Sequence, residues 1–279
     1  MDRDEYRRTS HENWQTTAAG WERRRAELER VTRPVTDSMV RALDPQPGDT
    51  MLELAAGPGD TGFVAAAALG ENGRLISTDF SSEMVEVARR RARELDVRNV
   101  EHLVVDAEEI PLDDASVDRA VCRFGFMLMA DPERALAETR RVVRPGGRLV
   151  VAVWGAAERN PWISIAGRLL ARLELAPPPE PGAPGMFVLA DHARLSTLLE
   201  GAGFEVERIE DVPVLFEFAD VAEYIAGSRE TGGMFARIWR DASDAERDAI
   251  RAGLDDGFAP FSVDGGYELP GQAVVAAAS

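Results

Sequence analysis

The sequence predicts an α/β fold in which a mostly parallel sheet is covered by helices on both faces. From Thr50 to Trp154, short apolar runs alternate with amphipathic stretches, which is the pattern of repeated strand–helix units. The first apolar run leads into a glycine-rich turn, and acidic residues follow the next strands at corresponding positions. Together these observations favour a nucleotide-binding α/β domain.

Each element of this region follows from its local pattern. Met84, Val85, Ala88, Ala92 and Leu95 recur at helical spacing, and Ser81 or Ser82 can cap that helix. Asp131 caps a later helix that has Pro132 at its first position. The expected strands are Thr50–Leu54, Leu75–Thr78, Leu103–Val105, Val117–Cys122 and Arg148–Trp154, and the helices between them are Thr61–Leu69, Ser82–Leu95 and Pro132–Val143.

The flanking segments are predicted to be mainly helical. Residues 10–43 form a helix that carries Trp14 and Trp21, and the proline- and glycine-rich stretch Pro177–Gly185 is a loop. The remaining expected elements are helices Ile163–Leu175, Asp191–Leu199, Ala219–Ala226 and Ser243–Asp255 and strands Phe204–Ile209 and Tyr267–Ala277. We therefore expect an N-terminal helical cap (1–46), a cofactor-binding core (47–154), a lid insertion (155–200) and C-terminal strands with a helical insertion (201–279).

Composition excludes several classes of function. The 279 residues include 32 Lys+Arg and 49 Asp+Glu, so the formal charge is −17, which disfavours nucleic-acid partners and anionic membranes. All 32 basic residues are arginine, which excludes a lysine Schiff base and the lysine of a P-loop. The single Cys122 and three scattered histidines argue against a metal site. No apolar run approaches membrane-spanning length, so we expect a cytoplasmic protein.

The glycine turn Gly57-x-Gly59-x-x-Gly62 is the most informative motif. Glycines permit the tight bend and expose bare backbone to a ligand at the start of a helix. Glu53 lies at the end of the strand before the turn, and Asp60 lies between its second and third glycines. Both would repel a pyrophosphate if they faced it, so they favour a cationic ligand without phosphate, such as S-adenosylmethionine. A plain structural glycine turn is the alternative.

Acidic residues also end the second and third strands. Asp79 can accept hydrogen bonds from both hydroxyls of a ribose, and Asp106 can accept from an adenine amino group while the next backbone N–H meets the ring. With Glu53, these carboxylates would lie along the carboxyl edge of one sheet, where open α/β sheets bind ligands. Taken singly, each acid can equally be a helix cap.

These motifs in this order resemble the class I S-adenosylmethionine-dependent methyltransferases, in particular the branch of the ubiquinone/menaquinone biosynthesis methyltransferases and related small-molecule methyltransferases. The resemblance covers about Pro47 to Trp154. It is carried by Glu53-Leu-Ala-Ala-Gly57-Pro-Gly59-Asp60, Asp79-x-Ser81-x-x-Met84, Asp106-Ala107-x-x-Ile110-Pro111 and Val143-Arg-Pro145-Gly146-Gly147.

The resemblance implies a Rossmann-like sheet of seven strands, with the reversed strand Tyr267–Ala277 inserted beside Arg148–Trp154, and helical lid insertions. It implies S-adenosylmethionine as cofactor, with its methionine part over Gly57–Gly59, its ribose at Asp79 and its adenine at Asp106. The cofactor-binding residues would be Glu53, Ala55, Gly57, Gly59, Asp60, Asp79, Phe80, Met84, Asp106, Ala107 and Arg123.

The acceptor is expected over the ends of the fourth and fifth strands. Aromatic side chains there could line an apolar pocket, although such residues usually belong to the core. The candidates are Phe124, Trp154 and Trp162, with Tyr224 from a later helix. Arg123 could bind an acidic or phenolate acceptor, or simply pair with one of the many acids.

We expect in-line methyl transfer to a small molecule, with oxygen favoured over carbon or nitrogen as the methylated atom. The protein mainly aligns the two reactants and excludes water. His11 is the candidate general base. The alternatives are a methyltransferase-like nucleoside-binding module without turnover and, more remotely, a nicotinamide oxidoreductase. A homodimer is left open.

Overall fold

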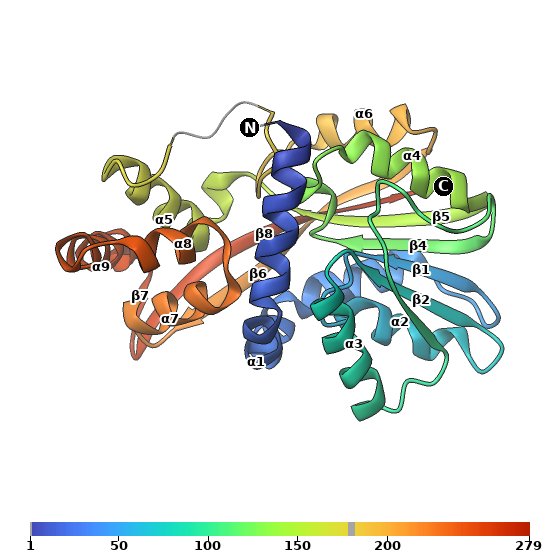
Figure 1. Ribbon diagram of the computed structural model, residues 1–279, viewed down its shortest axis with the longest axis horizontal. Coiled ribbons are helices and arrows are strands. Elements are labelled where there is room, and N and C mark those ends of the chain that lie inside the picture. The colour runs from blue at the N-terminus through green and yellow to red at the C-terminus, as the bar shows by residue number, and fades with distance from the viewer. Residues whose placement is uncertain (1, 178–181) are drawn as a thin grey trace.

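The computed structural model describes residues 2–177 and 182–279 and has the predicted α/β architecture (Figure 1). Seven strands form one sheet in the order β3-β2-β1-β4-β5-β8-β6, and the short β7 pairs with β8. The strands are β1 (Thr50–Leu54), β2 (Arg74–Asp79), β3 (Val100–Val104), β4 (Val117–Arg123), β5 (Val143–Trp154), β6 (Val206–Phe218), β7 (Ser262–Val263) and β8 (Gly266–Ala278). β1 to β5 are parallel, whereas β8 lies antiparallel between β5 and β6, so the reversed inserted strand is confirmed.

The sheet is the centre of the hydrophobic core. Met51, Leu52 and Leu54 of β1 are fully buried, as are Leu149 to Val153 of β5. Such unbroken apolar runs fit strands with helices on both faces. The helices are α1 (Arg3–Leu43), α2 (Asp60–Leu69), α3 (Ser82–Glu94), α4 (Pro132–Val142), α5 (Pro161–Arg172), α6 (His192–Gly201), α7 (Val221–Thr231), α8 (Gly233–Asp241) and α9 (Asp244–Phe258).

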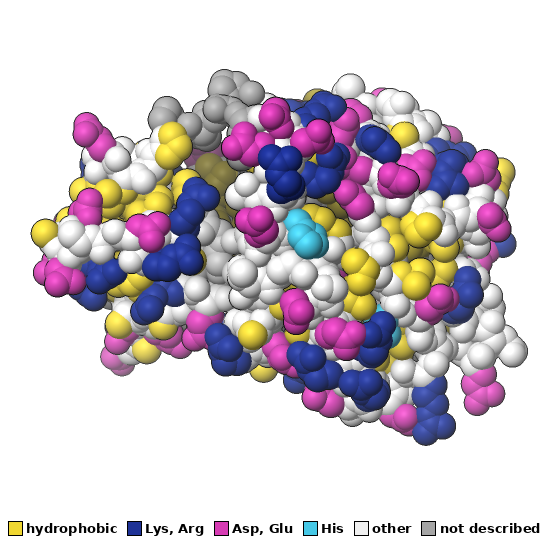
Figure 2. All heavy atoms as spheres, viewed as in Figure 1, with side chains coloured by type: hydrophobic (Ala, Val, Ile, Leu, Met, Phe, Trp, Pro, Cys, Tyr) yellow, Lys and Arg dark blue, Asp and Glu magenta, His cyan; other side chains and the backbone are white. Residues whose placement is uncertain are grey.

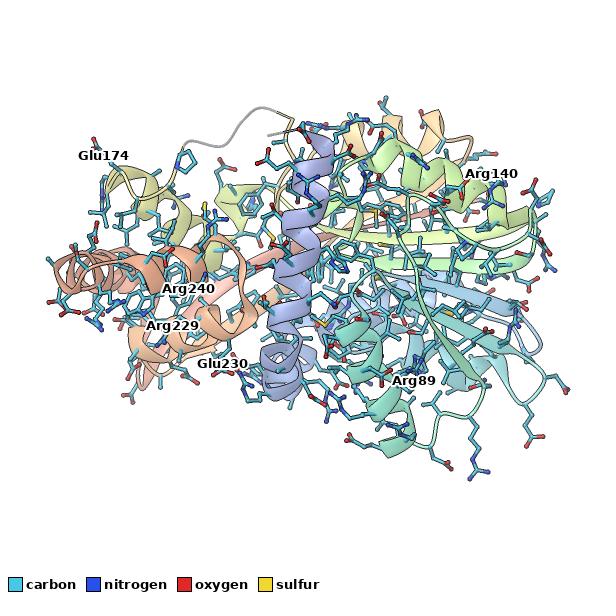
Figure 3. All side chains as sticks on the ribbon, viewed as in Figure 1. Arg89, Arg140, Glu174, Arg229, Glu230 and Arg240 are labelled. Carbon is cyan, nitrogen blue, oxygen red and sulfur yellow. The ribbon has the colours of Figure 1, made fainter. Side chains whose placement is uncertain are left out.

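Helix α1 is the longest element, with 41 residues, and runs across the front of the molecule between the core and the C-terminal helices (Figure 1). Asp2 caps it by accepting from the Glu5 N–H at 2.8 Å. At Gly20 the helix backbone touches the carbonyl of Glu230 near the end of α7, where a Cβ would come within 1.9 Å of the oxygen. Glu230 is labelled beside α1 in Figure 3. α1 therefore packs against both the α/β core and the C-terminal insertion.

Several elements differ from the sequence expectations. β3 begins at Val100 and β5 at Val143, earlier than predicted, and the short β7 was not expected. β6 extends to Phe218 instead of ending at Ile209, because it pairs with β8 along its whole length. Helix α8 was not expected, and α1 begins seven residues earlier than predicted. The loop Pro177–Gly185 lies partly outside the described residues. None of the described helices is long and apolar enough to cross a membrane.

Candidate functional site

The glycine turn lies between β1 and α2, at the carboxyl edge of the sheet. Its backbone is left-handed at Ala55 (φ 50°), Gly57 (φ 53°) and Gly59 (φ 85°). A Cβ at Gly57 would meet nothing within 4 Å, whereas one at Gly59 would lie 2.5 Å from the ring of Phe63. The two glycines thus have different roles: Gly59 allows close packing within the turn, while Gly57 presents bare backbone to open space that a ligand can use.

Glu53 is turned into the protein instead of toward that open space. Its carboxylate accepts from the N–H of Gly62 at 2.7 Å and from the hydroxyl of Ser77 at 3.3 Å. A Cβ at Gly62 would come within 2.1 Å of this carboxylate, so the third glycine is explained by close packing. Burial raises the pKa of Glu53 to about 7, against the opposing hydrogen bond from Gly62 and the charge of Arg123.

Asp79 lies at the end of β2, directly beside the turn. One carboxylate oxygen accepts from the Gly57 N–H at 2.9 Å and the other from the Ser81 N–H at 2.9 Å. Burial raises its pKa to about 6, although these backbone N–H groups oppose the shift. Each oxygen retains a lone pair, so the buried carboxylate is held in place and can still accept from a ribose hydroxyl.

Asp106 follows β3 on the same edge and is the more exposed of the two acids, at 39% of its side chain. It accepts from the Glu108 N–H at 2.9 Å, and its Oδ2 lies 3.4 Å from Nε of Arg7 in α1. Arg7 also pairs with the buried Glu108. Ala107, between Asp106 and Glu108, is buried. An arginine thus reaches the carboxylate where the adenine was expected.

Other side chains of α1 cover the neighbouring strand end. His11 packs edge-on against Phe80, with 5.3 Å between ring centroids. The amide oxygen of Gln15 accepts from the Ser81 hydroxyl at 2.6 Å. Met84 is buried in a small cluster with Ala18 and Val87, against Trp14 and Trp21. The first turns of α1 therefore form a cover over the half of the edge that carries Asp79 and Asp106.

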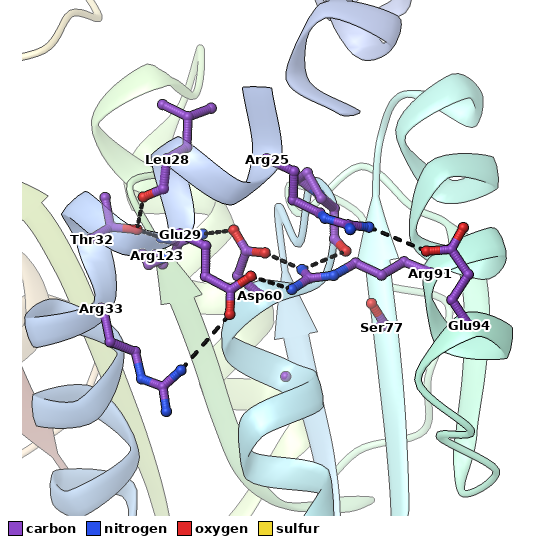
Figure 4. Close-up of polar contacts among 12 residues, drawn as sticks. Arg25, Leu28, Glu29, Thr32, Arg33, Asp60, Ser77, Arg91, Glu94 and Arg123 are labelled. Carbon is purple, nitrogen blue, oxygen red and sulfur yellow. Dashed lines mark hydrogen bonds and ion pairs between the residues drawn. The ribbon is translucent and has the colours of Figure 1, made fainter. Parts of the chain in front are cut away.

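Asp60 and Arg123 pair with each other instead of facing a ligand. Arg123 Nη2 donates to Asp60 Oδ2 at 2.8 Å, and the second oxygen of Asp60 binds Arg91 (Figure 4). This corrects the premise that Glu53 and Asp60 would both face a bound phosphate: each is turned into the protein. The sequence left two partners open for Arg123, an acidic methyl acceptor or one of the protein's own acids. In the structure Arg123 pairs with an acid of the protein, Asp60.

Aromatic side chains meet at the ends of β4 and β5. The rings of Phe124 and Trp154 are stacked, with 4.1 Å between centroids and 7° between planes. Trp162 packs edge-on against Trp154 at 5.0 Å and stacks on Phe216 at 4.0 Å. Trp154 and Phe216 are buried, so only Phe124 and Trp162 keep partly exposed rings. We call Phe124, Trp154, Trp162 and Phe216 the acceptor wall. Sequence reasoning missed Phe216, although the alternation from Val212 to Phe218 was a signal for it.

Tyr224 lies apart from this wall, within the helical insertion. It is buried against Phe218, Phe235 and Phe258, and burial raises its pKa to about 12. In the structure, Tyr224 therefore packs in the core and does not contact the acceptor wall residues Phe124, Trp154 or Trp162.

The other two histidines also lie away from the wall. His102 is in β3, edge-on to Phe63, and neither ring nitrogen has a partner among the described residues. Burial lowers its pKa. His192 opens α6 and bonds the exposed Asp211 at 2.8 Å.

Comparisons with known proteins show what the chain is similar to. Residues 30–164 match the ubiE/COQ5 methyltransferase family. The chain is similar to the ubiquinone/menaquinone biosynthesis C-methyltransferase UbiE of Acidiphilium cryptum, with 43% identity over 39% of this chain and 43% of that protein. It is also similar to a demethylmenaquinone methyltransferase of Clavibacter sepedonicus, with 40% identity over 40% of this chain and 43% of that protein. The chain thus spans less than half the length of these curated relatives.

Among solved structures, the chain resembles the geranyl diphosphate C-methyltransferase of Streptomyces coelicolor in complex with S-adenosyl-L-homocysteine. The TM-score is 0.54 at 18% identity, covering 91% of this chain and 81% of that one, which establishes the fold. The predicted resemblance and fold class are confirmed, and the match to the ubiE/COQ5 methyltransferase family lies in residues 30–164.

Proposed function

We propose that the chain is an S-adenosylmethionine-dependent methyltransferase that acts on a small molecule. The observation that carries the proposal is the alignment of three adjacent strands. β1 ends in the open glycine turn, β2 ends in Asp79, and β3 leads to Asp106, all on one edge of the sheet. Along this edge lie bare backbone, a carboxylate that can accept hydrogen bonds from ribose hydroxyls, and a carboxylate that can accept one from the adenine amino group. This is the order in which the methionine, ribose and adenine parts of the cofactor are connected.

The residues of this edge fit the cofactor. Gly57 leaves room above its backbone for the methionine part, and the fixed oxygens of Asp79 can accept from the ribose hydroxyls. Asp106 and the N–H of Ala107 can pair with the adenine, and Phe80 can pack beside it. When bound, S-adenosylmethionine supplies an electrophilic methyl group on a sulfonium.

The acceptor wall supports an aromatic or apolar acceptor. It lies over β4 and β5, across the glycine turn from the nucleoside half. In Figure 2 a recess with hydrophobic side chains in its floor opens between the start of α5 and the N-terminal part of α1. Aromatic walls bind planar apolar bodies and exclude water, and alignment of the two reactants lowers the barrier to transfer.

The chemistry of the wall favours an acceptor that is acidic by itself. Neither phenylalanine nor tryptophan can take a proton from the nucleophile. The candidate base His11 packs against Phe80, on the nucleoside half, so its position favours a covering role. We therefore propose methyl transfer to the oxygen of a phenolic or enolic hydroxyl. Carbon is the second candidate, because the UbiE relative is named a C-methyltransferase.

The test is incubation of the chain with S-adenosylmethionine carrying a ¹³C-methyl group and a panel of phenols, enols and quinols. Carbon-13 NMR of the products separates oxygen-bound from carbon-bound methyl groups. We expect an O-methyl product that the Asp79→Ala variant forms much more slowly. Carbon-bound label alone would overturn the choice of atom. Cofactor binding without turnover of any acceptor would favour a binding module.

A further inference from the structure

A buried carboxylate links the glycine turn to the strand that carries the acceptor wall. Asp60, the first residue of α2, is 5% exposed and receives Arg91 on one oxygen and Arg123 on the other. The second nitrogen of the Arg123 guanidinium donates to the hydroxyl of Thr32 in α1. Thr32 in turn donates to the Leu28 carbonyl at 2.8 Å, so the guanidinium is held from two sides (Figure 4).

The charges of this cluster balance. Arg91 binds Glu29 at 2.7 Å as well as Asp60, and Arg33 links Glu29 at 3.8 Å to Asp37 at 2.9 Å. The cluster therefore contains three carboxylates and three guanidinium groups. They come from α1, α2, α3 and β4, the elements that surround the glycine turn. Removal of one partner from a buried cluster leaves an unpaired charge, so these contacts fix the four elements relative to one another.

The residue after Arg123 has an unusual backbone. Phe124 is left-handed (φ 61°), a conformation that is an outlier for a bulky residue and persists only where the surroundings impose it. Its N–H donates to the Ala152 carbonyl at 2.7 Å, and its ring is stacked on Trp154. The Arg123 guanidinium carbon lies 5.8 Å from the centre of the Phe124 ring. The anchored arginine is thus one constraint on the strained turn.

We propose that Arg123 is a positioning residue that sets the acceptor wall relative to the glycine turn. It acts through Asp60 on one side and through the backbone of Phe124 on the other, without contact to the reactants. The proposal rests on the methyltransferase function above, because the wall lies on the acceptor side only if the turn holds the methyl donor.

The test uses the full chain labelled with 5-fluorotryptophan, with the ¹⁹F resonance of Trp154 assigned from a Trp154→Phe variant. Its chemical shift reports the stacked Phe124 ring. The test variants are Arg123→Met, Arg123→Lys and the milder Thr32→Val, which removes only one partner of the guanidinium. Arg91→Met is the matched control, because it takes a guanidinium from the same carboxylate but belongs to α3. Melting temperature and binding of S-adenosylhomocysteine are measured for each variant.

We expect the Trp154 resonance to shift or broaden in the folded Arg123 and Thr32 variants and to stay in place in Arg91→Met, even where Arg91→Met melts at a lower temperature. An unchanged Trp154 resonance in Thr32→Val and in every Arg123 variant that folds would overturn the proposal. So would an equal change in Arg91→Met, because that indicates general loosening. Failure of the unmodified chain to bind S-adenosylhomocysteine would instead refute the proposed function.

Discussion

Arg7 Nε lies 3.4 Å from Oδ2 of Asp106, the carboxylate that is expected to receive the adenine amino group. The same guanidinium pairs with the buried Glu108. A bound adenine and Arg7 would therefore compete for one acceptor. We therefore expect the Arg7 side chain to move when the nucleoside binds.

Replacing Arg7 should strengthen cofactor binding. Because Arg7 is partly exposed, its pairs are worth up to about 1 kcal/mol, so Arg7→Gln should raise the affinity for S-adenosylhomocysteine by up to about fivefold. Isothermal titration calorimetry measures this. Arg3→Gln is the matched control, because Arg3 lies on the same helix and pairs with Asp131 instead. Weaker binding in Arg7→Gln would show that Arg7 closes over the cofactor instead of competing with it.

Cofactor binding should depend on the ionisation of Asp79. Burial raises its pKa to about 6, and the charged carboxylate is the better acceptor for ribose hydroxyls. Affinity for S-adenosylhomocysteine should therefore fall as the pH drops below about 6, approaching tenfold per pH unit. Asp79→Asn should bind more weakly at pH 8 and lose this pH dependence. A variant that keeps the full dependence would assign it to another group.

Glu53 should make the protein less stable as the pH rises. Its pKa of about 7 in the folded state exceeds the unfolded value of 4.5, so the folded state holds a proton that the unfolded state releases. This contribution is complete below pH 4.5 and is lost by pH 7. The difference in unfolding free energy between the unmodified chain and Glu53→Gln should fall by up to about 3 kcal/mol across that window.

Urea denaturation at several pH values measures this difference. Glu22→Gln is the control with the opposite sign, because Arg90 lowers the pKa of Glu22. If the difference in unfolding free energy between the unmodified chain and Glu53→Gln stayed constant or rose with pH, the account would be contradicted.

The strain at Phe124 can be separated from the loss of its ring. Phe124→Ala and Phe124→Gly remove the same stacking, but only glycine adopts a left-handed backbone without penalty. Phe124→Gly should therefore be more stable than Phe124→Ala by roughly 0.5–1 kcal/mol, the reverse of the usual order. Phe126 is the control: it is buried in the next turn without a positive φ, so Phe126→Ala should be more stable than Phe126→Gly. If thermal unfolding showed the alanine variant to be the more stable one at both positions, the strain argument would be wrong.

The strands and the glycine turn were predictable because their signals are local. An apolar run, a glycine turn and an amphipathic helix specify a β-α unit within about thirty residues. The positions of Asp79 and Asp106 followed from the same pattern. The directions in which the Glu53 and Asp60 side chains point could not be predicted, because their partners are set by the tertiary fold. The arginines that bind Asp60 lie 31 and 63 residues along the chain.

The C-terminal insertion was less predictable. β6 reaches Phe218 only because β8, whose first residues lie nearly fifty positions further on, pairs with it throughout. Phe216 enters the acceptor wall for this reason. Helix α8 is short and begins at Gly233, so the sequence contained neither a capping residue nor a long run of apolar residues at helical spacing to predict it.

The most direct test of the account is calorimetric titration of the chain with S-adenosylhomocysteine, with NADH as the comparison. The account predicts micromolar binding of S-adenosylhomocysteine alone, weakened in Asp79→Ala and Asp106→Ala. No binding, or a preference for NADH, would contradict it and leave the glycine turn as a general nucleotide-binding or structural feature.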